Sequence, residues 1–501
     1  MCKLLCVSLF FLSVSNLFVC DPRQKKEGGK REKQPPKVAS EQPSLQARIS
    51  PKMFSLLLKA RAVSAELRSD SLIRLATSNL TQSNDLKVEL LDEAFSYAGD
   101  SAFDVKKTQF AGTYADAPSG YLAQAYDLDL DTISLRCRVV SAMSKVDQKR
   151  AKDLFSGIGI KSHLQTAASC KESLIFDVRV YYESFKDLTK SAFSAKQIEE
   201  GYKAQFIEDR IYEMVSPVQI GPLAKALKAL NLDSDGLQRF VPAFSRQLRQ
   251  LSSDYRTFYA SEAVFSVTES INELVLLMEK GGIPSRVLAD AYRDYVVKSV
   301  SQRVCADNYE GEGKLPAFVR RANFFVFAWK PITKEEVKTL GVDPSYEEAP
   351  FWTSPISRKL LDDLRRLKFN EKGGLYTDAE RDTARWKEQL GDVLRVMADW
   401  RRADEISEEA YLNEKAIAYR TLLEVAPTDD IRAEILRGFL NFLESFNPDK
   451  INRIELYWHL KAVLAQARTT DGKVRSAMIT KLASSTNPIL ELYASLISEG
   501  V

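Results

Sequence analysis

The sequence predicts an all-α protein of about twenty helices, packed in antiparallel pairs as an irregular α-solenoid or a multi-helix bundle. Two observations support this fold class. Proline, which interrupts helices, is absent from residues 119–216 and 356–426. Apolar residues also recur at helical spacing in many segments, and capping residues bound those segments. Because the chain shows no fixed repeat and lacks the tetratricopeptide signature, any solenoid is expected to be irregular.

The helical pattern is clearest in the C-terminal part of the chain. Between residues 407 and 427 one apolar stripe runs along a predicted helix and consists of Leu412, Ala416, Tyr419 and Leu423. Thr428 is a cap candidate for the helix that follows. Earlier helices begin with capping boxes, formed by Ser194 with Gln197 and by Thr377 with Glu380.

A turn-rich segment separates two predicted helical lobes. The stretches CADNYEGEGKLP and GVDPSYEEAPFWTSP flank the apolar run FFVFAW, which follows Asn323 and is expected to pack in the core and not to bind a ligand. All five tryptophans follow residue 328. The predicted parts are a signal peptide (1–20), a disordered basic tether (21–50), an N-terminal helical lobe (51–304), an irregular connector (305–356) and a C-terminal helical lobe (357–501).

The first twenty residues have the layout of an export signal. Lys3 precedes an apolar run that ends at Val19 and is short for a membrane span, which needs roughly 20 apolar residues. The sequence LFVC resembles a bacterial lipobox and makes Cys20 a candidate lipid attachment site, although Val19 stands where that motif has a small residue. The alternatives are ordinary cleavage near Ser13 and Ser15, or a retained segment.

The net positive charge of the chain lies near its N-terminus, whereas basic and acidic residues balance in the body. Residues 21–50 are rich in proline, glycine and charged residues and contain no aromatic residue, so they lack the apolar surface that folding requires. The whole chain has a net charge of +3, whereas residues 42–501 hold 63 basic and 64 acidic residues. This near-neutral body lacks the basic excess of nucleic-acid-binding domains, so we expect no nucleic acid among the partners.

Five stretches resemble uncharacterised helical proteins that are exported by acidobacteria. They are SGYLAQAYDLDLDTISLRCRVVSAM, SAFSAKQIEEG, MVSPVQIGPLAKAL, RVCADN and NPILELYASL. The similarity extends over most of residues 60–498. The resemblance implies a periplasmic or cell-envelope location and carries over no catalytic residue, because none of these stretches has a known chemical role.

Three cysteines fall in the predicted helical body, so at most one internal disulfide can form there. They are Cys137, Cys170 and Cys305. The spacing alone leaves all three pairings open. We favour Cys170 with Cys305, because both lie at apparent helix ends, and the alternative is three separate buried thiols.

The strongest catalytic candidate is Glu183. It forms a Glu-Ser dipeptide with Ser184, as in the lytic transglycosylases, where one glutamate acts as general acid on a glycosidic bond. The later Gly-Leu-Met-Gln motif of those enzymes is missing. With only two histidines and no recognisable nucleotide or hydrolase motif, the chain is expected to be non-catalytic, and a carboxylate-dependent glycan hydrolase that uses Glu183 is the alternative.

Two acidic clusters resemble the start of a calcium-binding loop and depart from it at the twelfth position. Asn231, Asp233 and Asp235 match the start of an EF-hand loop, but Pro242 occupies the twelfth position, where a glutamate is needed. The cluster DLDLD places Arg138 at that position. We expect helix caps there instead, at Asp131 and at Ser234 or Asp235, and no metal or other cofactor.

Together these observations predict an exported helical scaffold or interaction protein in the bacterial cell envelope. Its partner is expected to be a protein or another envelope component. A lipid on Cys20, if it is attached, would hold the chain at the membrane.

Overall fold

The computed structural model describes residues 49–109, 118–164, 168–252, 254–311, 313–344, 352–381, 383–446, 453–469 and 472–501. The predicted signal peptide with Cys20 and nearly all of the predicted tether lie outside these residues. Ser50–Val501 forms one compact unit. Searched over the described residues, none of the helices combines the length and the hydrophobicity that a membrane-spanning segment needs.

The prediction of an all-α protein is confirmed. The first elements are α2 (Pro51–Arg61), α3 (Ala65–Thr77), α4 (Asn84–Ala98), β1 (Lys107–Gln109), α5 (Pro118–Tyr126), α6 (Thr132–Met143), α7 (Gln148–Ser156), α8 (Ile160–His163), β2 (Leu174–Phe176) and α9 (Arg179–Ser191). After them come α10 (Ala195–Glu199), α11 (Tyr202–Tyr212), η1 (Pro217–Gln219), α12 (Ile220–Ala229), α13 (Ser234–Gln250), α14 (Tyr255–Phe265), α15 (Val267–Lys280) and α16 (Arg286–Val300).

The remaining elements include two short strands. They are β3 (Val304–Cys305), η2 (Ala306–Asn308), α17 (Ala317–Phe325), β4 (Val342–Asp343), α18 (Pro355–Lys368), α19 (Asp378–Arg381), α20 (Ala384–Asp399), α21 (Glu408–Val425), α22 (Asp429–Glu444), α23 (Arg453–Thr469), α24 (Gly472–Ala483) and α25 (Pro488–Ser498). Strand β1 pairs antiparallel with β2, and β3 pairs parallel with β4.

Local capping sets where many helices begin. Thr428 caps α22 by accepting a hydrogen bond from the backbone of Ile431, and Ser194 forms the predicted capping box with Gln197. One predicted cap is wrong. Helix α13 is capped by Asp233 and not by Ser234 or Asp235, because the Asp233 carboxylate accepts from the N–H of Gly236.

The helices pack in a chain of neighbours, as expected for stacked helical pairs. Helix α3 contacts α4, α4 contacts α6, α6 contacts α9, α9 contacts α12, and α12 contacts α15. Most residues of the helices α3, α6, α12 and α21 are buried, so each of these helices lies in the core. In the C-terminal part α18 packs on α21, α21 packs on both α22 and α23, and α24 packs on α25.

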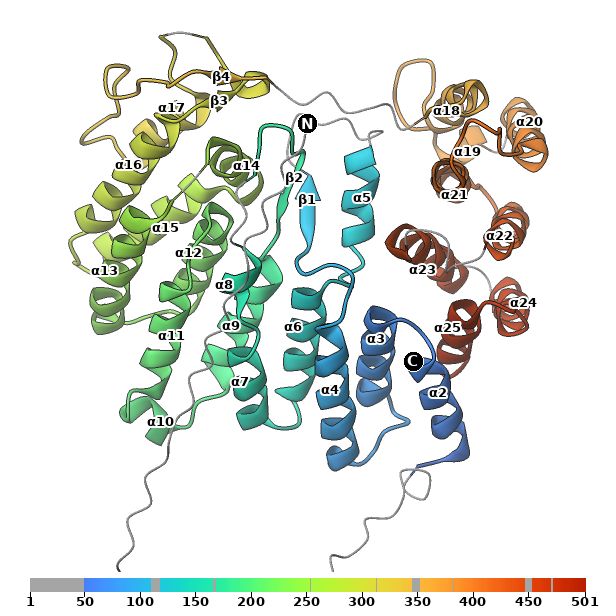
Figure 1. The fold of residues 1–501 in the computed structure, drawn as a ribbon, viewed down its shortest axis with the longest axis horizontal. Helices are drawn as coiled ribbons and strands as arrows, with labels where there is room; N and C mark the ends of the chain where they lie inside the picture. The colour runs from blue at the N-terminus through green and yellow to red at the C-terminus, as the bar shows by residue number, and fades with distance from the viewer. Residues whose placement is uncertain are drawn as a thin grey trace, which may run out of the picture. The chain divides into compact units, whose positions relative to one another are not determined.

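The last helices also contact the first ones. Helix α25 packs on the blue helix α2, and α23 packs on the cyan helix α5, so the red C-terminal helices lie beside early helices of the chain (Figure 1). An open solenoid lacks such contacts between its ends. The predicted lobes therefore touch each other through helices that are almost the whole chain apart in sequence.

A buried charge cluster lies at this junction. The fully buried carboxylate of Asp70 on α3 accepts hydrogen bonds from Arg74 (2.9 Å), Arg138 on α6 (2.7 Å) and Tyr493 on α25 (2.7 Å). The ammonium group of Lys461 on α23 lies 3.9 Å from the same carboxylate. We call these five residues the Asp70 cluster.

Electrostatics keep this carboxylate charged. Burial alone would raise the pKa of Asp70, but the charges of Lys461, Arg138 and Arg74 hold it well below its ordinary value. The cluster joins four helices, and its loss would leave partly buried cations without a partner.

Candidate binding cavity in the connector

The connector, used here for residues 305–344, is anchored to the helical body at its start. Cys305 in β3 forms a disulfide with Cys170, which lies in the loop before β2, and their Cα atoms are 5.3 Å apart. This is the pairing that the sequence favours, although neither residue lies directly at a helix end. The third thiol, Cys137, is free and buried.

Two buried arginines anchor the connector further along. Arg256 on α14 forms a salt bridge with Asp307 and donates to the backbone carbonyl of Glu172 at 2.7 Å. Arg293 on α16 forms a salt bridge with Glu336 at 2.6 Å and donates to the carbonyl of Lys330 at 2.9 Å. Charge-assisted bonds to buried guanidinium groups are strong, so the connector is held at both ends.

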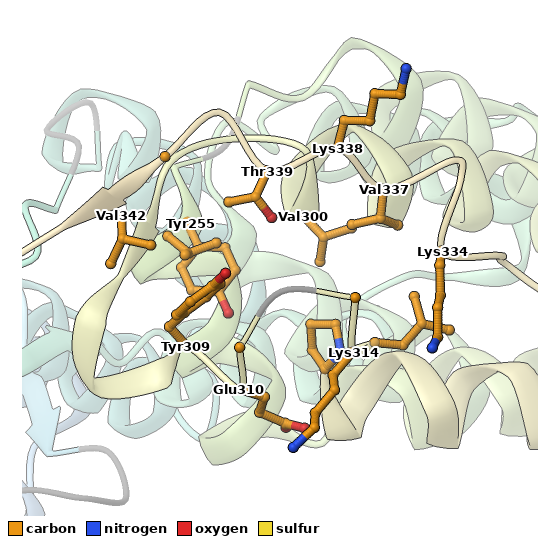
Figure 2. Close-up of a pocket in the computed structure, with 16 residues that line it drawn as sticks. Tyr255, Val300, Tyr309, Glu310, Lys314, Lys334, Val337, Lys338, Thr339 and Val342 are labelled. Atoms are coloured by element: carbon orange, nitrogen blue, oxygen red, sulfur yellow. The ribbon is translucent and has the colours of Figure 1, made fainter.

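The anchored connector encloses a cavity of about 430 Å³ against the ends of α14 and α16 (Figure 2). Its lining residues are Tyr255, Val300, Val304, Tyr309, Glu310, Gly311, Gly313, Lys314, Leu315, Pro316, Lys334, Val337, Lys338, Thr339, Gly341 and Val342. In Figure 2, Val337 and Thr339 point towards the cavity, whereas the ammonium group of Lys338 points away from it. We call this space the connector cavity.

The walls of the connector cavity combine apolar and hydrogen-bonding groups. Val300, Val304 and Val337 supply apolar surface, while Tyr255 and Tyr309 add phenol groups. Burial raises the pKa of Tyr255, and the nearby acidic groups raise it further, so its hydroxyl stays protonated and can donate a hydrogen bond.

The charge of the lining is predominantly positive. Within the part of the chain that the structure describes, the lining lysines Lys314, Lys334 and Lys338 make no salt bridge. Among the described lining residues Glu310 is the single acidic one, and it is bound to Arg320 at 2.8 Å and to the N–H of Ala317 at 2.9 Å.

These bonds decide what Glu310 can do. The hydrogen bond from Arg320 holds the pKa of Glu310 below its ordinary value, so this carboxylate stays ionised near neutral pH and is not suited to act as a general acid. The cavity is therefore suited to bind an anionic group with some apolar surface.

The structure does not bring Glu183 into this cavity. Glu183 lies on α9, its side chain is 65% exposed, and it forms a salt bridge with Lys186 one turn further along the helix. A general acid for glycoside cleavage needs a raised pKa, which burial among apolar groups provides. Glu183 has no such surroundings.

The calcium candidates have structural partners. Asn231 adopts a left-handed conformation (φ +51°) in the turn before α13, and Asp233 caps that helix. Asp127 and Asp129 both pair with Lys106 at 3.1 Å. Among the described residues, no group of three or more His, Cys, Asp or Glu side chains is placed to hold a metal ion.

Asp131 is the predicted cap of α6, and the prediction is confirmed because its carboxylate accepts from the N–H of Ser134. Burial raises the pKa of Asp131 to about 6, although the hydrogen bonds from Ser134 oppose this shift.

The prediction for the apolar run after Asn323 is wrong in part. Val326 and Phe327 are buried, but Phe324, Phe325 and Trp329 are 76%, 47% and 42% exposed. The physical reason is that the run ends α17 and turns, so its side chains point in several directions.

The lining residues of the connector cavity were not predicted as a site. The sequence does show lysines at 314, 330, 334 and 338 within a turn-rich segment, which is the signal that points here in retrospect. A scan of the chain against protein-family models finds no match, and neither does a search of curated proteins.

Proposed function

We propose that this protein is a non-catalytic helical scaffold of the bacterial cell envelope that binds an anionic group of its partner in the connector cavity. One observation carries the proposal. Lys314 and Lys334, which make no salt bridge among the described residues, line a cavity whose walls are held by a disulfide and two buried arginines. A pre-organised wall reduces the entropy that binding costs.

The side chains that line the cavity indicate which chemical group it binds. Ammonium groups and phenol hydroxyls donate hydrogen bonds to carboxylate or phosphate oxygens, and the valines fit the carbon skeleton next to such an oxygen group. The partner is therefore a protein or another envelope component that presents a carboxylate or a phosphate.

The location is part of the same proposal. The export-like residues 1–20 and the resemblance to exported proteins of acidobacteria support a periplasmic or cell-envelope setting, with Cys20 as the lipid attachment site. The mass of the mature N-terminal peptide, taken from membrane and soluble fractions, tests this part. A diacylglyceryl-modified Cys20 supports tethering, and an intact Met1 contradicts export.

Site-specific photo-cross-linking in intact cells tests binding. A photoreactive amino acid replaces Val337, which points towards the cavity, and in a matched control it replaces Leu375, which is exposed in the loop between α18 and α19. We expect an adduct of defined mass from position 337 only. The adduct should disappear in Lys314→Ser/Lys334→Ser/Lys338→Ser.

Two results contradict the proposal: the same adduct from both positions, or an adduct from position 337 that persists without the three lysines. Mass spectrometry of the adduct shows whether the bound molecule carries a carboxylate or a phosphate. Neither result depends on whether Cys20 is lipidated.

A further inference from the structure

Three aromatic side chains project from the surface near the end of α17. Phe324, Phe325 and Trp329 are 76%, 47% and 42% exposed, and Phe324 is the most exposed of the large hydrophobic side chains that the structure describes. Single exposed apolar residues are ordinary, but here two adjacent rings and a third exposed ring occur within six positions of the chain. We call these three residues the aromatic patch.

The aromatic patch is held in place by its neighbours. The rings of Phe324 and Phe325 lie edge to face with centroids 5.0 Å apart. The guanidinium of Arg321 is 6.0 Å from the ring of Phe325, and the guanidinium of Arg286 on α16 is 5.2 Å from the ring of Trp329. Each ring pair or ring–cation pair adds a favourable contact that orients the exposed side chains.

The backbone under the patch is also fixed. On the other side of α17, Val319 and Ala322 are buried, and α17 packs on α15. The side chain of Asn323 donates to the carbonyl of Ile332 at 2.9 Å and accepts from its N–H at 2.8 Å. The rings are therefore presented by an ordered support, so their exposure is a property of the fold.

Positive charge accompanies the rings along the same segment. Lys314, Lys330, Lys334 and Lys338 make no salt bridge within the described part of the chain, and Lys338 directs its ammonium group away from the cavity (Figure 2). The acidic Glu336 is neutralised by Arg293, and the exposed Glu335 lies near Lys334. Residues 313–338 thus present lysines together with exposed rings.

We propose that this face of the protein docks on the surface of an anionic lipid bilayer. Exposed Trp and Phe side chains insert at the boundary between headgroups and acyl chains, and lysines are attracted to anionic headgroups. A second copy of the chain is disfavoured as the occupant because it would bring the same unpaired lysines together. The contact is separate from a lipid on Cys20. It shares Lys314, Lys334 and Lys338 with the proposed cavity site, and the aromatic patch distinguishes the two contacts.

Vesicle co-sedimentation of residues 21–501 tests the inference. This chain lacks the predicted leader, so it carries no attached lipid, and it contains the whole compact unit Ser50–Val501. Vesicles of phosphatidylcholine alone are compared with vesicles that also contain roughly 30% phosphatidylglycerol. We expect binding to the anionic vesicles, weakened as the salt concentration rises.

Matched variants show whether vesicle binding depends on the aromatic patch or on exposed apolar side chains in general. Phe324→Ser/Phe325→Ser/Trp329→Ser should weaken anionic-vesicle binding by roughly tenfold or more. Phe369→Ser/Leu375→Ser, which removes two exposed apolar side chains elsewhere, should leave it unchanged. The basic residues of the tether are present in every variant, so the difference reports on the rings.

Three results overturn the inference. They are no binding to anionic vesicles, binding that is equal in the triple variant and the parent chain, and an aromatic-dependent dimer that does not bind vesicles. Should the triple variant fail to fold, Phe324→Ser alone provides the test, because this ring is largely in solvent. The single variant is then expected to weaken vesicle binding at an unchanged melting temperature.

Discussion

In the Asp70 cluster, three cationic side chains surround one fully buried carboxylate, whereas the lysines that line the connector cavity make no salt bridge among the described residues. The first arrangement joins helices from the two ends of the chain. The second leaves its charge available to something outside the chain. The difference shows that positive charge marks a candidate site only where burial and internal partners do not already account for it.

Asp70→Asn should produce the largest effect. Removing the charge leaves Arg74, Arg138 and Lys461 next to each other without an anion, which we expect to lower the free energy of unfolding by about 3–5 kcal/mol. Urea denaturation measures this loss. The exposed pair Asp392–Arg395 is the control, because Asp392→Asn should cost about 0–1 kcal/mol.

The pH dependence gives the same cluster a second test. Because the pKa of Asp70 is lower in the folded than in the unfolded chain, its contribution is fully present above the ordinary aspartate pKa of about 4. It is lost as the pH falls further, through the folded-state pKa. If the parent chain and Asp70→Asn already had the same free energy of unfolding at pH 6, this would contradict a lowered pKa of Asp70 in the folded chain.

Opening the disulfide is expected to have the next largest effect. Cys170→Ser/Cys305→Ser removes a cross-link between two residues that are 135 positions apart in the sequence. We expect the free energy of unfolding to fall by about 2–4 kcal/mol. A reductant should bring the parent chain to the same value and leave the variant unchanged. A parent chain that does not respond to reductant would mean that this bond does not stabilise the protein.

Lys415 is a third kind of cation in this molecule, buried among rings and not beside a carboxylate. Its ammonium group donates to the carbonyl of Trp400 at 2.7 Å and lies 5.0 Å from the ring of Phe442. Burial lowers the pKa of Lys415 to about 8, and the charge of Arg401 adds to this.

The sign of the pH effect follows from this lowered pKa. Between about pH 8 and pH 10 the unfolded chain holds a proton that the folded chain has released, so stability rises with pH. Relative to Lys415→Met, the parent chain should gain about 1–2 kcal/mol between pH 7 and pH 9.5 in chemical denaturation. Parallel pH curves for the two proteins would show that this lysine titrates normally.

Lys314→Ser/Lys334→Ser/Lys338→Ser should affect stability much less than the changes above. These lysines are exposed and lack a described ion-pair partner, so we expect the free energy of unfolding to change by less than about 0.5 kcal/mol. The same variant should lose the cross-link from the cavity. If the triple lysine variant lost as much stability as Asp70→Asn, the lysines of the connector cavity would stabilise the fold as the Asp70 cluster does, which contradicts the proposed difference between the two regions.

The smallest effect is expected for Glu183→Gln. This side chain is mostly in solvent and pairs only with Lys186, so stability should stay within about 0.5 kcal/mol of the parent value. The variant and the parent should also behave alike in a turbidity assay on purified cell wall. Parent-only clearing of the cell wall would revive the glycan-hydrolase alternative and remove the scaffold proposal.

Local features of the fold were predictable because they depend on neighbouring residues. Thr428 and Asp131 cap their helices as expected, since a cap uses an oxygen and an N–H only three residues apart. The Asp233 cap was misplaced by one or two residues, which is the usual uncertainty at a helix end.

The candidate site depended on contacts that sequence spacing does not reveal. The lysines of the connector cavity are distinctive because they make no salt bridge among the described residues, while similar residues such as Lys461 and Arg138 are used internally. Exposure likewise separates Phe324 from Phe327, which are three positions apart in the same apolar run.

The sequence by itself determined the helical class, the position of many helices and the near-neutral charge of the body, because periodicity, capping and composition are properties of the local chain. Only the tertiary structure decided that Tyr493 binds Asp70, that the connector encloses a cavity and that three aromatic rings stay in solvent. These outcomes depend on which surfaces of distant segments meet, and a side chain acquires its burial and its partners only when they do.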